Sequence, residues 1–221
     1  MRSLRCYGVR LSGWTASFRH PQFVTGAQPT LPLPPPSTIY GLIAAAAGRW
    51  VNPDECRVAY VFQSEGKARD LEKIYQFSRS SNASSTVIYR DWLTDWRLWL
   101  YFADPVWAEN FRSPVFPLTL GRQQELAHVD IGPGGETTRE VELSRSRTVL
   151  KGTAVPFPFS GASGLLMALP TVMSPDLPRQ AIGVRPWLLV REDAKLDSPE
   201  VWHDEEFNHG VHFIGGTESE S

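Results

Sequence analysis

The chain has 221 residues, 42% of them hydrophobic, which excludes disorder throughout and allows one large domain or two small ones. No apolar run approaches the roughly 18 residues of a membrane span, and the N-terminus lacks an apolar signal segment, so we expect no membrane partner. The net charge of −2 argues against nucleic acid, but residues 192–221 hold nine Asp and Glu against one Lys, so the rest of the chain is basic.

The chain opens with a predicted strand. Residues 2–12 alternate in the way that favours a strand with both faces partly covered. Gly13 and Trp14 are expected to bend it before a second extended piece at residues 15–18. Cys6, in the strand, and Cys56, further along, form neither a metal-binding spacing nor a disulfide framework, which predicts a reducing, cytoplasmic location.

A proline-rich loop and a helix follow in residues 18–50. The prolines at 29, 32 and 34–36 exclude a helix and a central strand, so we expect a stiff surface loop. Ser37 and Thr38 are typical N-cap residues, and the apolar run after them predicts a helix that ends at Gly48. Because a helix N-terminus offers free N–H groups and a positive partial charge, we expect the loop to face an anion such as RNA. The alternative is a plain connector before a capped helix.

Two β-rich stretches and a polar segment make up residues 57–102. Residues 57–63 and 87–102 predict strands, and alternation places Trp96 and its even-numbered neighbours on one face. The segment from Gly66 predicts either a helical turn or a long hairpin arm. Its serine-rich residues 78–86 predict a flexible tip or loop.

The second half alternates short predicted elements with turns. Asp104 and Pro105 predict the start of a short helix, and Pro133-Gly134-Gly135 predicts a turn. Strands are expected at 126–131, 137–149, 165–172 and 183–190, and disorder at 215–221.

Two motifs in residues 1–130 occur together in one protein family. The first, P-P-S-T-x-x-G-L-x-x-A-x-x-G, runs from Pro35 to Gly48 and follows the segment SFRHPQF. The second, P-x-x-L-G-R, runs from Pro117 to Arg122. In this order and spacing they resemble the Cas-five family, RAMP-type subunits of the type I CRISPR Cascade surveillance complex. The resemblance implies an RRM-like palm with a protruding β-hairpin thumb; beyond residue 150 little of the family is recognisable.

The expected fold class is therefore α+β. We expect a ferredoxin-like or RRM-like domain at 1–131 with a hairpin insertion around 64–95, then a small β-rich part at 132–205 and an acidic, largely disordered tail at 206–221. The order β–α–β–hairpin–β–α–β in the first domain is compatible with this fold.

RNA recognition needs cations for phosphates and flat side chains for bases. Gly121 is expected to let another backbone come close to the loop that carries Arg122. The resemblance implies that the cluster at 19–23 and the Leu-Gly-Arg element lie near the 5′ handle of the guide RNA; for each single arginine the alternative is a solvated surface charge. The candidate RNA-binding residues are Arg19, His20, Gln22, Phe23, Ser37, Thr38, Lys67, Arg69, Arg122 and Gln123. The tryptophans Trp92, Trp96, Trp99 and Trp107 are predicted to lie in the core.

Catalysis is not expected. A His, Tyr and Lys set can cleave RNA without metal, and His20 with Tyr40 offers part of one. One branch of the resembled family processes guide RNA in this way, but its Lys-His pair before Leu-Gly-Arg is missing here, where residues 116–119 read FPLT. The run HDEEFNHGVH at 203–212 lacks a zinc spacing, so neither a metal nor another cofactor is expected.

The sequence thus predicts a non-catalytic Cascade subunit for antiviral defence. Its expected partners are the guide RNA handle and the backbone subunit whose filament it caps. The resemblance further implies contact with the large subunit and with target DNA near the protospacer-adjacent motif. The alternatives are a metal-independent endoribonuclease that processes precursor guide RNA, a scaffold that binds protein only, and a subunit of a transposon-associated Cascade.

Overall fold

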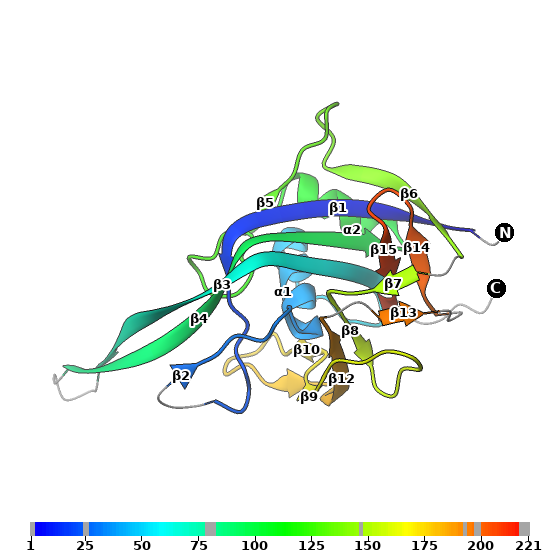
Figure 1. Ribbon diagram of the computed structural model, residues 1–221. Helices are drawn as coiled ribbons and strands as arrows, with labels where there is room; N and C mark the ends of the chain where they lie inside the picture. Colours follow the sequence, from blue (N-terminus) through cyan, green and yellow to red (C-terminus); the bar gives the residue numbers. More distant parts are fainter. Residues whose placement is uncertain are drawn as a thin grey trace.

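The computed structural model describes residues 3–23, 27–77, 83–145, 148–191, 194–196 and 200–216. Within these residues the chain is mostly β, with one long sheet from which a two-stranded hairpin projects (Figure 1). The strands of this sheet are β1 (Ser3–Ala16), β2 (Ala27–Gln28), β3 (Val58–Phe77), β4 (Ala83–Phe102), β5 (His128–Val129), β6 (Thr138–Ser144), β7 (Thr148–Leu150), β13 (Ala194–Leu196), β14 (Trp202–Asp204), β15 (His209–Val211) and β16 (Phe213–Ile214).

The remaining elements are two small sheets and short helices. The helices are α1 (Pro36–Ala47), α2 (Pro105–Glu109) and the 3₁₀ turn η1 (Asn110–Arg112). Of the small sheets, one pairs β8 (Thr153–Pro156), β12 (Arg185–Val190) and β9 (Leu165–Leu169), and the other pairs β10 (Val172–Met173) with β11 (Ala181–Ile182). Neither α1 nor any other helix in the described residues has the length and apolar composition needed to cross a membrane.

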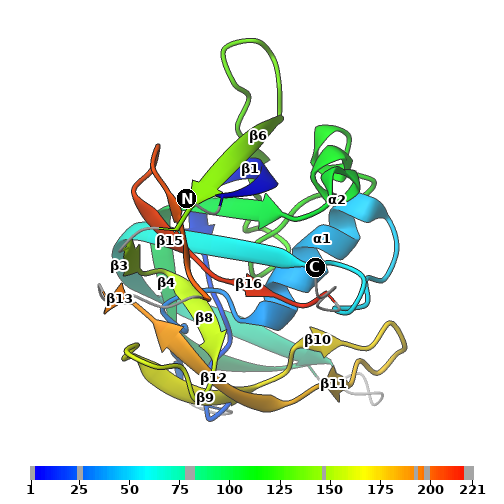
Figure 2. The ribbon, with the colours of Figure 1, turned by 90° about the vertical axis from the view of Figure 1, so that its right-hand side faces the viewer.

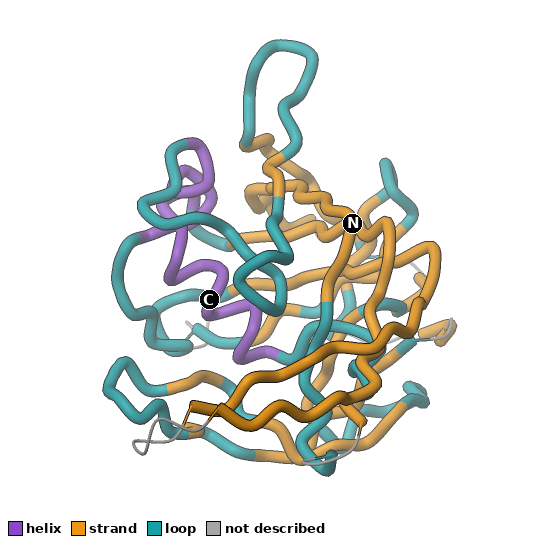
Figure 3. The backbone as a smooth tube through the Cα atoms, turned by 90° about the vertical axis from the view of Figure 1, so that its left-hand side faces the viewer, coloured by secondary structure: helices purple, strands orange, loops and turns teal. Residues whose placement is uncertain are grey.

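The large sheet runs in the order β13-β7-β15-β14-β6-β1-β4-β3-β16. In its centre β6, β1, β4 and β3 are antiparallel neighbours. The helices lie together on one side of these strands (Figure 3). The elements β1, α1, β3, β4, α2 and β6 therefore form one unit, whose fourth long strand is β6 at 138–144. The expected fourth strand at 126–131 is present only as the short β5, which pairs with Leu11 and Ser12 of β1.

The central strands bury a core on each face because their side chains alternate. On the helix side, Trp96 is fully buried, next to Leu98 and Leu100 and beneath α1. On the other side, Trp99 and Tyr101 lie in a second cluster with Val211 of β15. The prediction that the tryptophans are core residues is confirmed for Trp96, Trp99 and Trp107, while Trp92 is half-buried.

The hairpin is one continuous antiparallel pair. The β3–β4 register runs from Val58 opposite Phe102 to Phe77 opposite Ala83. The segment after Gly66 is therefore a hairpin arm and not a helical turn. Of the expected serine-rich tip, residues 78–82 lie outside the described residues, and residues 83–86 belong to β4.

The C-terminal region is more ordered than expected. The residues 206–216, assigned above to a disordered tail, contain β15 and β16, which pair with β14, β7 and β3 of the large sheet. An acidic composition therefore does not by itself indicate disorder in this part of the chain. Because β6, β14 and β15 belong to the large sheet, its hydrogen bonding continues across the expected boundary at 131/132. Residues 217–221 lie outside the described part of the chain.

Candidate nucleic-acid interface

The predicted cluster at residues 19–23 forms one turn just after β1. The backbone N–H of Phe23 donates to the carbonyl of His20 (3.2 Å), and the two rings meet edge to face with centroids 5.0 Å apart. The N–H of Gln22 donates to Nδ1 of the same histidine (3.4 Å). Arg19 is exposed and bridges to Thr30 through the backbone. The structure thus brings together a cation and two aromatic rings at the surface, as the sequence predicted.

The base of this turn is fixed to the core. The N–H of Phe18 donates to Oγ1 of Thr30 (2.8 Å), and the N–H of Leu31 donates to the carbonyl of Phe18 (2.8 Å). The Phe18 ring is buried and packs edge to face on Phe62 of β3, with centroids 5.5 Å apart. The exposed side chains therefore project from an anchored loop, and less conformational entropy is lost when they bind a ligand.

Lys67 and Arg69 lie on the hairpin and share one carboxylate. Lys67 Nζ is 2.7 Å from Oδ2 of Asp91, and Arg69 Nε is 2.6 Å from Oδ1. The hydrogen bonds from Arg69 and Lys67 lower the pKa of Asp91. The two basic side chains are 52% and 65% exposed, so they stay accessible, but the group carries only one net positive charge.

A cleft of about 540 Å³ opens beside Lys67, between the base of the hairpin, the proline-rich loop and the small sheet of β9 and β12. Thr30 and Arg191 also line it. A smaller adjoining cleft shares Arg191 and adds Lys151. The sequence analysis missed these last two cations because they come from a part of the chain with no recognised motif, where only their charge could have indicated them.

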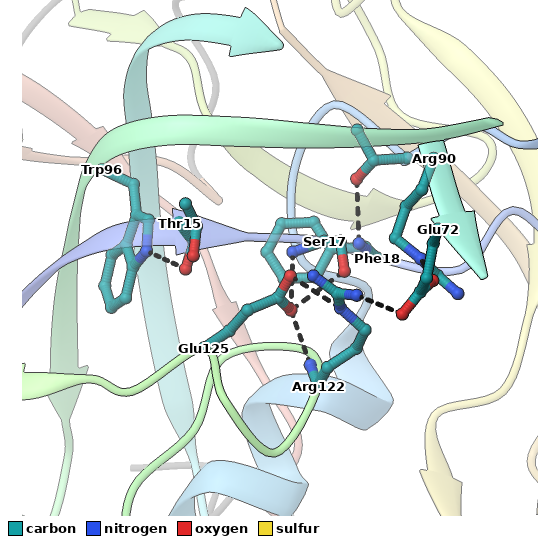
Figure 4. A network of polar contacts seen from close by, with 9 residues as sticks. Thr15, Ser17, Phe18, Glu72, Arg90, Trp96, Arg122 and Glu125 are labelled. Atoms are coloured by element: carbon teal, nitrogen blue, oxygen red, sulfur yellow. Dashed lines mark hydrogen bonds and ion pairs between the residues drawn. The ribbon is translucent and has the colours of Figure 1, made fainter. Parts of the chain in front are cut away.

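Arg122 of the Leu-Gly-Arg element is held inside a polar network (Figure 4). Its Nη1 donates to Glu72 of the hairpin (2.8 Å), its Nε donates to Glu125 (3.1 Å), and its guanidinium lies over the ring of Trp92, 5.1 Å from the centroid. Its side chain is 21% exposed. Glu72 also accepts from Arg90 of β4. The arginine therefore connects the 117–126 loop to the hairpin, and few N–H donors of its guanidinium group remain available to bind a phosphate. Gln123, beside it, is exposed.

Glu125 is the residue that holds this loop, and the sequence analysis did not find it. The carboxylate is buried and accepts from the N–H and the hydroxyl of Ser17 (3.1 and 2.9 Å) and from the N–H and Nε of Arg122 (2.6 and 3.1 Å). Gly121 has φ 127°, and a Cβ there would lie 2.5 Å from the carbonyl oxygen of Ser17. The expected close backbone approach at Gly121 is confirmed.

The N-terminus of α1 differs from the prediction. Its N-cap is Pro35, with no side-chain cap, so Ser37 and Thr38 are not capping residues but half-buried residues of the first turn. The N–H groups of Thr38 and Ile39 both donate to the carbonyl of Pro35 (2.9 and 3.3 Å), and Pro36 has no N–H. The first turn therefore offers few free donors to an anion. Gly48 ends the helix in the left-handed conformation, as expected.

The proline-rich loop is also less exposed than predicted. Pro34, Pro35 and Pro36 are buried, and the hydroxyl of Tyr60 donates to the carbonyl of Pro34 (2.7 Å). The prediction of a stiff surface loop is therefore wrong for its last part. The stiff prolines fit a buried path equally well, because they have no N–H to satisfy.

The histidine- and acid-rich run at 203–212 is part of the fold. Asp204 is buried and accepts from the hydroxyl of Tyr101 (2.7 Å), and His203 Nδ1 lies 2.8 Å from the hydroxyl of Thr148. His209 packs edge to face on Trp99, with centroids 4.7 Å apart. Across the described ranges, no three His, Cys, Asp or Glu side chains form a group suited to a metal ion.

Comparison with known proteins places the chain in a family. The family model of the CRISPR-associated protein (Cas_Cas5) matches residues 6–130. The chain belongs to the Cas5 family. No curated protein matches it. A solved chain described as "CRISPR RNA-guided surveillance complex" is similar in fold, with a TM-score of 0.55 and 19% identity over 86% of this chain and 91% of that one. Another, described as "Crystal Structure of CRISPR-associated Protein", has a TM-score of 0.35 and 18% identity over 59% of this chain and 68% of that one.

The match ends at residue 130, so the family model includes the turn at 19–23, helix α1, the hairpin and the Arg122 loop. It excludes β6, although β6 pairs with β1 from Ser3 to Val9. Residues 131–221, which include Lys151 and Arg191 of the clefts, therefore lie beyond the matched segment of this Cas5 protein.

Proposed function

We propose that this Cas5 protein is a non-catalytic subunit of a Cascade-type surveillance complex that grips the 5′ handle of the guide RNA at the base of the hairpin. One observation carries the proposal. Thr30, the backbone partner of Arg19, and Lys67 of the hairpin line the same cleft, so the 19–23 turn is joined through Thr30 to the wall of the cleft that the hairpin cation also lines. Cations and flat rings around a groove suit a single strand with splayed bases.

The hairpin supports a wedge role within this proposal. Its outward face exposes Leu71, Tyr75, Val87 and Tyr89, each more than half exposed. The other face is held by Glu72 through Arg90 and Arg122. A braced hairpin with an apolar outer face can displace a nucleotide and cover the end of a filament of backbone subunits. An asymmetric end subunit of this kind stops the growth of an open assembly.

The topology supports a ferredoxin-like unit. The order β6-β1-β4-β3, all antiparallel and with the two helices on one side, is the arrangement that a βαββαβ unit produces. In this interpretation the β3–β4 hairpin is the thumb.

Exposed apolar side chains on and around the small sheets support contact with another subunit. We propose that this partner is the large subunit, and that through it the protein approaches target DNA near the protospacer-adjacent motif. These side chains are Leu165 and Leu166 of β9, Ile182 of β11, and Leu177 and Val184 in the connections before and after β11.

The test is handle binding by an Arg19→Ala, Lys67→Ala variant. Each lost phosphate contact with a single strand removes about 0.7 from the slope of log K against log salt, so we expect the slope to fall by about 1.4 and the affinity to fall about 25-fold at about 0.1 M salt. The control removes two exposed arginines elsewhere, Arg112→Ala with Arg179→Ala. An unchanged slope in the first variant would remove this cavity from the RNA site.

The processing-nuclease alternative has a separate test. Tyr40, the candidate partner of His20, is buried, and its hydroxyl donates to the carbonyl of Cys56 (3.1 Å). Burial raises its pKa far above the ordinary value, so the phenol is not available as a base. We expect the purified protein to leave repeat RNA intact without metal. Specific cleavage that His20→Ala abolishes would support the alternative.

A further inference from the structure

Arg191 directly follows β12 and lines both of the clefts beside the hairpin. It is exposed, and among the described residues it forms no ion pair with a carboxylate. The larger cleft, of about 540 Å³, has Lys67 of the hairpin in its lining, whereas the smaller one, of about 280 Å³, does not. Arg191 is therefore a cation of two connected spaces, and it lies beyond the segment that matches the Cas5 family.

Close backbone packing fixes the strand that carries Arg191. The small sheet of β8, β12 and β9 lies below β3 in both Figure 1 and Figure 2. Gly152 joins the two parts, because its N–H donates to the carbonyl of Val190 (2.7 Å) and its carbonyl accepts from the N–H of Phe62 in β3 (2.8 Å). Gly152 has φ 67°, and a Cβ there would lie 2.1 Å from the carbonyl oxygen of Phe62. A glycine is therefore needed at this approach, and it ties the residue before Arg191 to the strand that begins the hairpin.

A second glycine holds the wall that the small sheet contributes. Gly164, Leu165 and Leu189 all line the larger cleft, and Leu165 of β9 pairs with Leu189 of β12. A Cβ at Gly164 would lie 2.2 Å from the carbonyl oxygen of Leu189, so the chain that enters β9 lies directly on β12. Arg191 thus projects from the end of a closely packed pair of strands. Its support is already ordered before a ligand binds, which lowers the entropy lost on binding.

The two clefts meet at four residues that occur in both linings: Pro32, Ser64, Glu65 and Arg191. Glu65 is the carboxylate in each lining, and it faces two cations in each, Lys67 with Arg191 in the larger cleft and Lys151 with Arg191 in the smaller. Lys67 is also paired with Asp91. Each cleft is therefore positive on balance, and Arg191 contributes to both.

We propose that Arg191 binds a second phosphate of the guide RNA handle, on the side of the smaller cleft, while Lys67 binds a different phosphate in the larger one. The inference rests on the proposed function, because it requires the handle to occupy the larger cleft. A guanidinium offers paired N–H donors that match a phosphate. A single strand that passes the junction of the clefts is then held from two sides, by the hairpin and by the small sheet.

The test combines Arg191→Gln with handle RNA that carries one neutral methylphosphonate, placed at each phosphate in turn. With unmodified single-stranded handle RNA at about 0.1 M salt, we expect Arg191→Gln to lower the affinity about 5-fold and the salt slope by about 0.7. At one position, the neutral phosphate should weaken binding to wild type but not to Arg191→Gln, because that contact is already lost. Lys67→Ala should show the same coupling at a different position.

The control is Arg179→Gln, which makes the same charge change at an exposed position outside both clefts and should couple to no phosphate. Thermal unfolding checks that each variant is folded, and Arg191→Lys, which keeps the charge without the paired donors, should recover part of the affinity. A loss with Arg191→Gln no larger than the control's would overturn the inference, as would coupling at no phosphate or at the phosphate that couples to Lys67. If the Arg19→Ala, Lys67→Ala variant still loses affinity in that case, the handle site stands and only the role of Arg191 fails.

Discussion

His209 should make the stability of the protein depend on pH. The imidazole is 8% exposed, packs against Trp99 and Phe207, and lies 3.2 Å from the amide nitrogen of Gln63 through Nε2. Burial lowers its pKa from 6.5 to about 4, although Asp204 acts in the opposite direction. The folded state therefore disfavours the protonated ring, and the unfolded chain binds the proton more tightly.

The magnitude follows from linkage. A group with a depressed folded pKa contributes its full stability above the unfolded pKa and loses it as the pH falls toward the folded one. For a shift from 6.5 to about 4, lowering the pH from about 7.5 to about 5 costs about 2 kcal/mol of unfolding free energy. The lowered pKa of His212 acts in the same direction. The salt-bridged Asp91 and Glu55 start from 3.8 and 4.5, so they lose their contribution mainly below this window.

The assay is urea unfolding followed by tryptophan fluorescence at both pH values. We compare wild type with His209→Gln and with a control, His128→Gln, at an exposed position of β5. The His209→Gln variant should be less stable at the higher pH and should lose about 2 kcal/mol less than wild type on acidification. The control should lose as much as wild type. If the His209 variant lost the same amount as wild type, burial of this ring would not be the cause of the acid sensitivity.

Two further substitutions test the candidate interface. Asp91→Asn removes the carboxylate shared by two hairpin cations, so it should raise the affinity for handle RNA and steepen the salt dependence of binding. Asp176→Asn, at an exposed position, should change both the affinity and its salt dependence less. Equal effects of the two substitutions would mean that only the net charge of the protein matters. Gly121→Ala should lower the unfolding free energy by about 2–3 kcal/mol, because the residue has a positive φ and a Cβ would collide with the backbone of Ser17. Gly135→Ala, with positive φ but no atom within 4 Å, should cost less in the same denaturation experiment.

The sequence predicted best those elements whose causes are local. The glycine that ends α1, the Asp104 side chain that accepts from the N–H of Val106 at the start of α2 (2.9 Å), and the alternation around Trp96 all act within a few residues. The grouping of charged and aromatic side chains at 19–23 was also predictable because its cause is local. Its cation and rings are neighbours in sequence, and the structure only had to place them at the surface.

What the sequence could not show is which charged groups meet across long separations. Arg122 and Glu72 are 50 positions apart, and Glu125 and Ser17 are 108 apart. Each reads in isolation as a solvated polar residue, but together they bind a loop to a hairpin and a strand. Asp204 is a third case, because its partner Tyr101 is 103 positions away. A count of acidic residues cannot separate a buried acceptor from a solvated charge.

These pairings also decide where the protein can meet a polyanion. Near the hairpin, Lys67 and Arg69 share Asp91, Arg90 and Arg122 share Glu72, and Arg122 also pairs with Glu125, so four cations face three carboxylates and carry a net charge of about one. Within the described residues, Arg191, which lines the hairpin cleft, and Arg19, on the turn beside Thr30, form no ion pair with a carboxylate. Because few unpaired charges border the hairpin cleft, charge alone would bind RNA there weakly. Under the proposed function, recognition of the handle must then depend on the shape of the anchored loop and the hairpin, and we expect scrambled RNA to be the poorer ligand at every salt concentration.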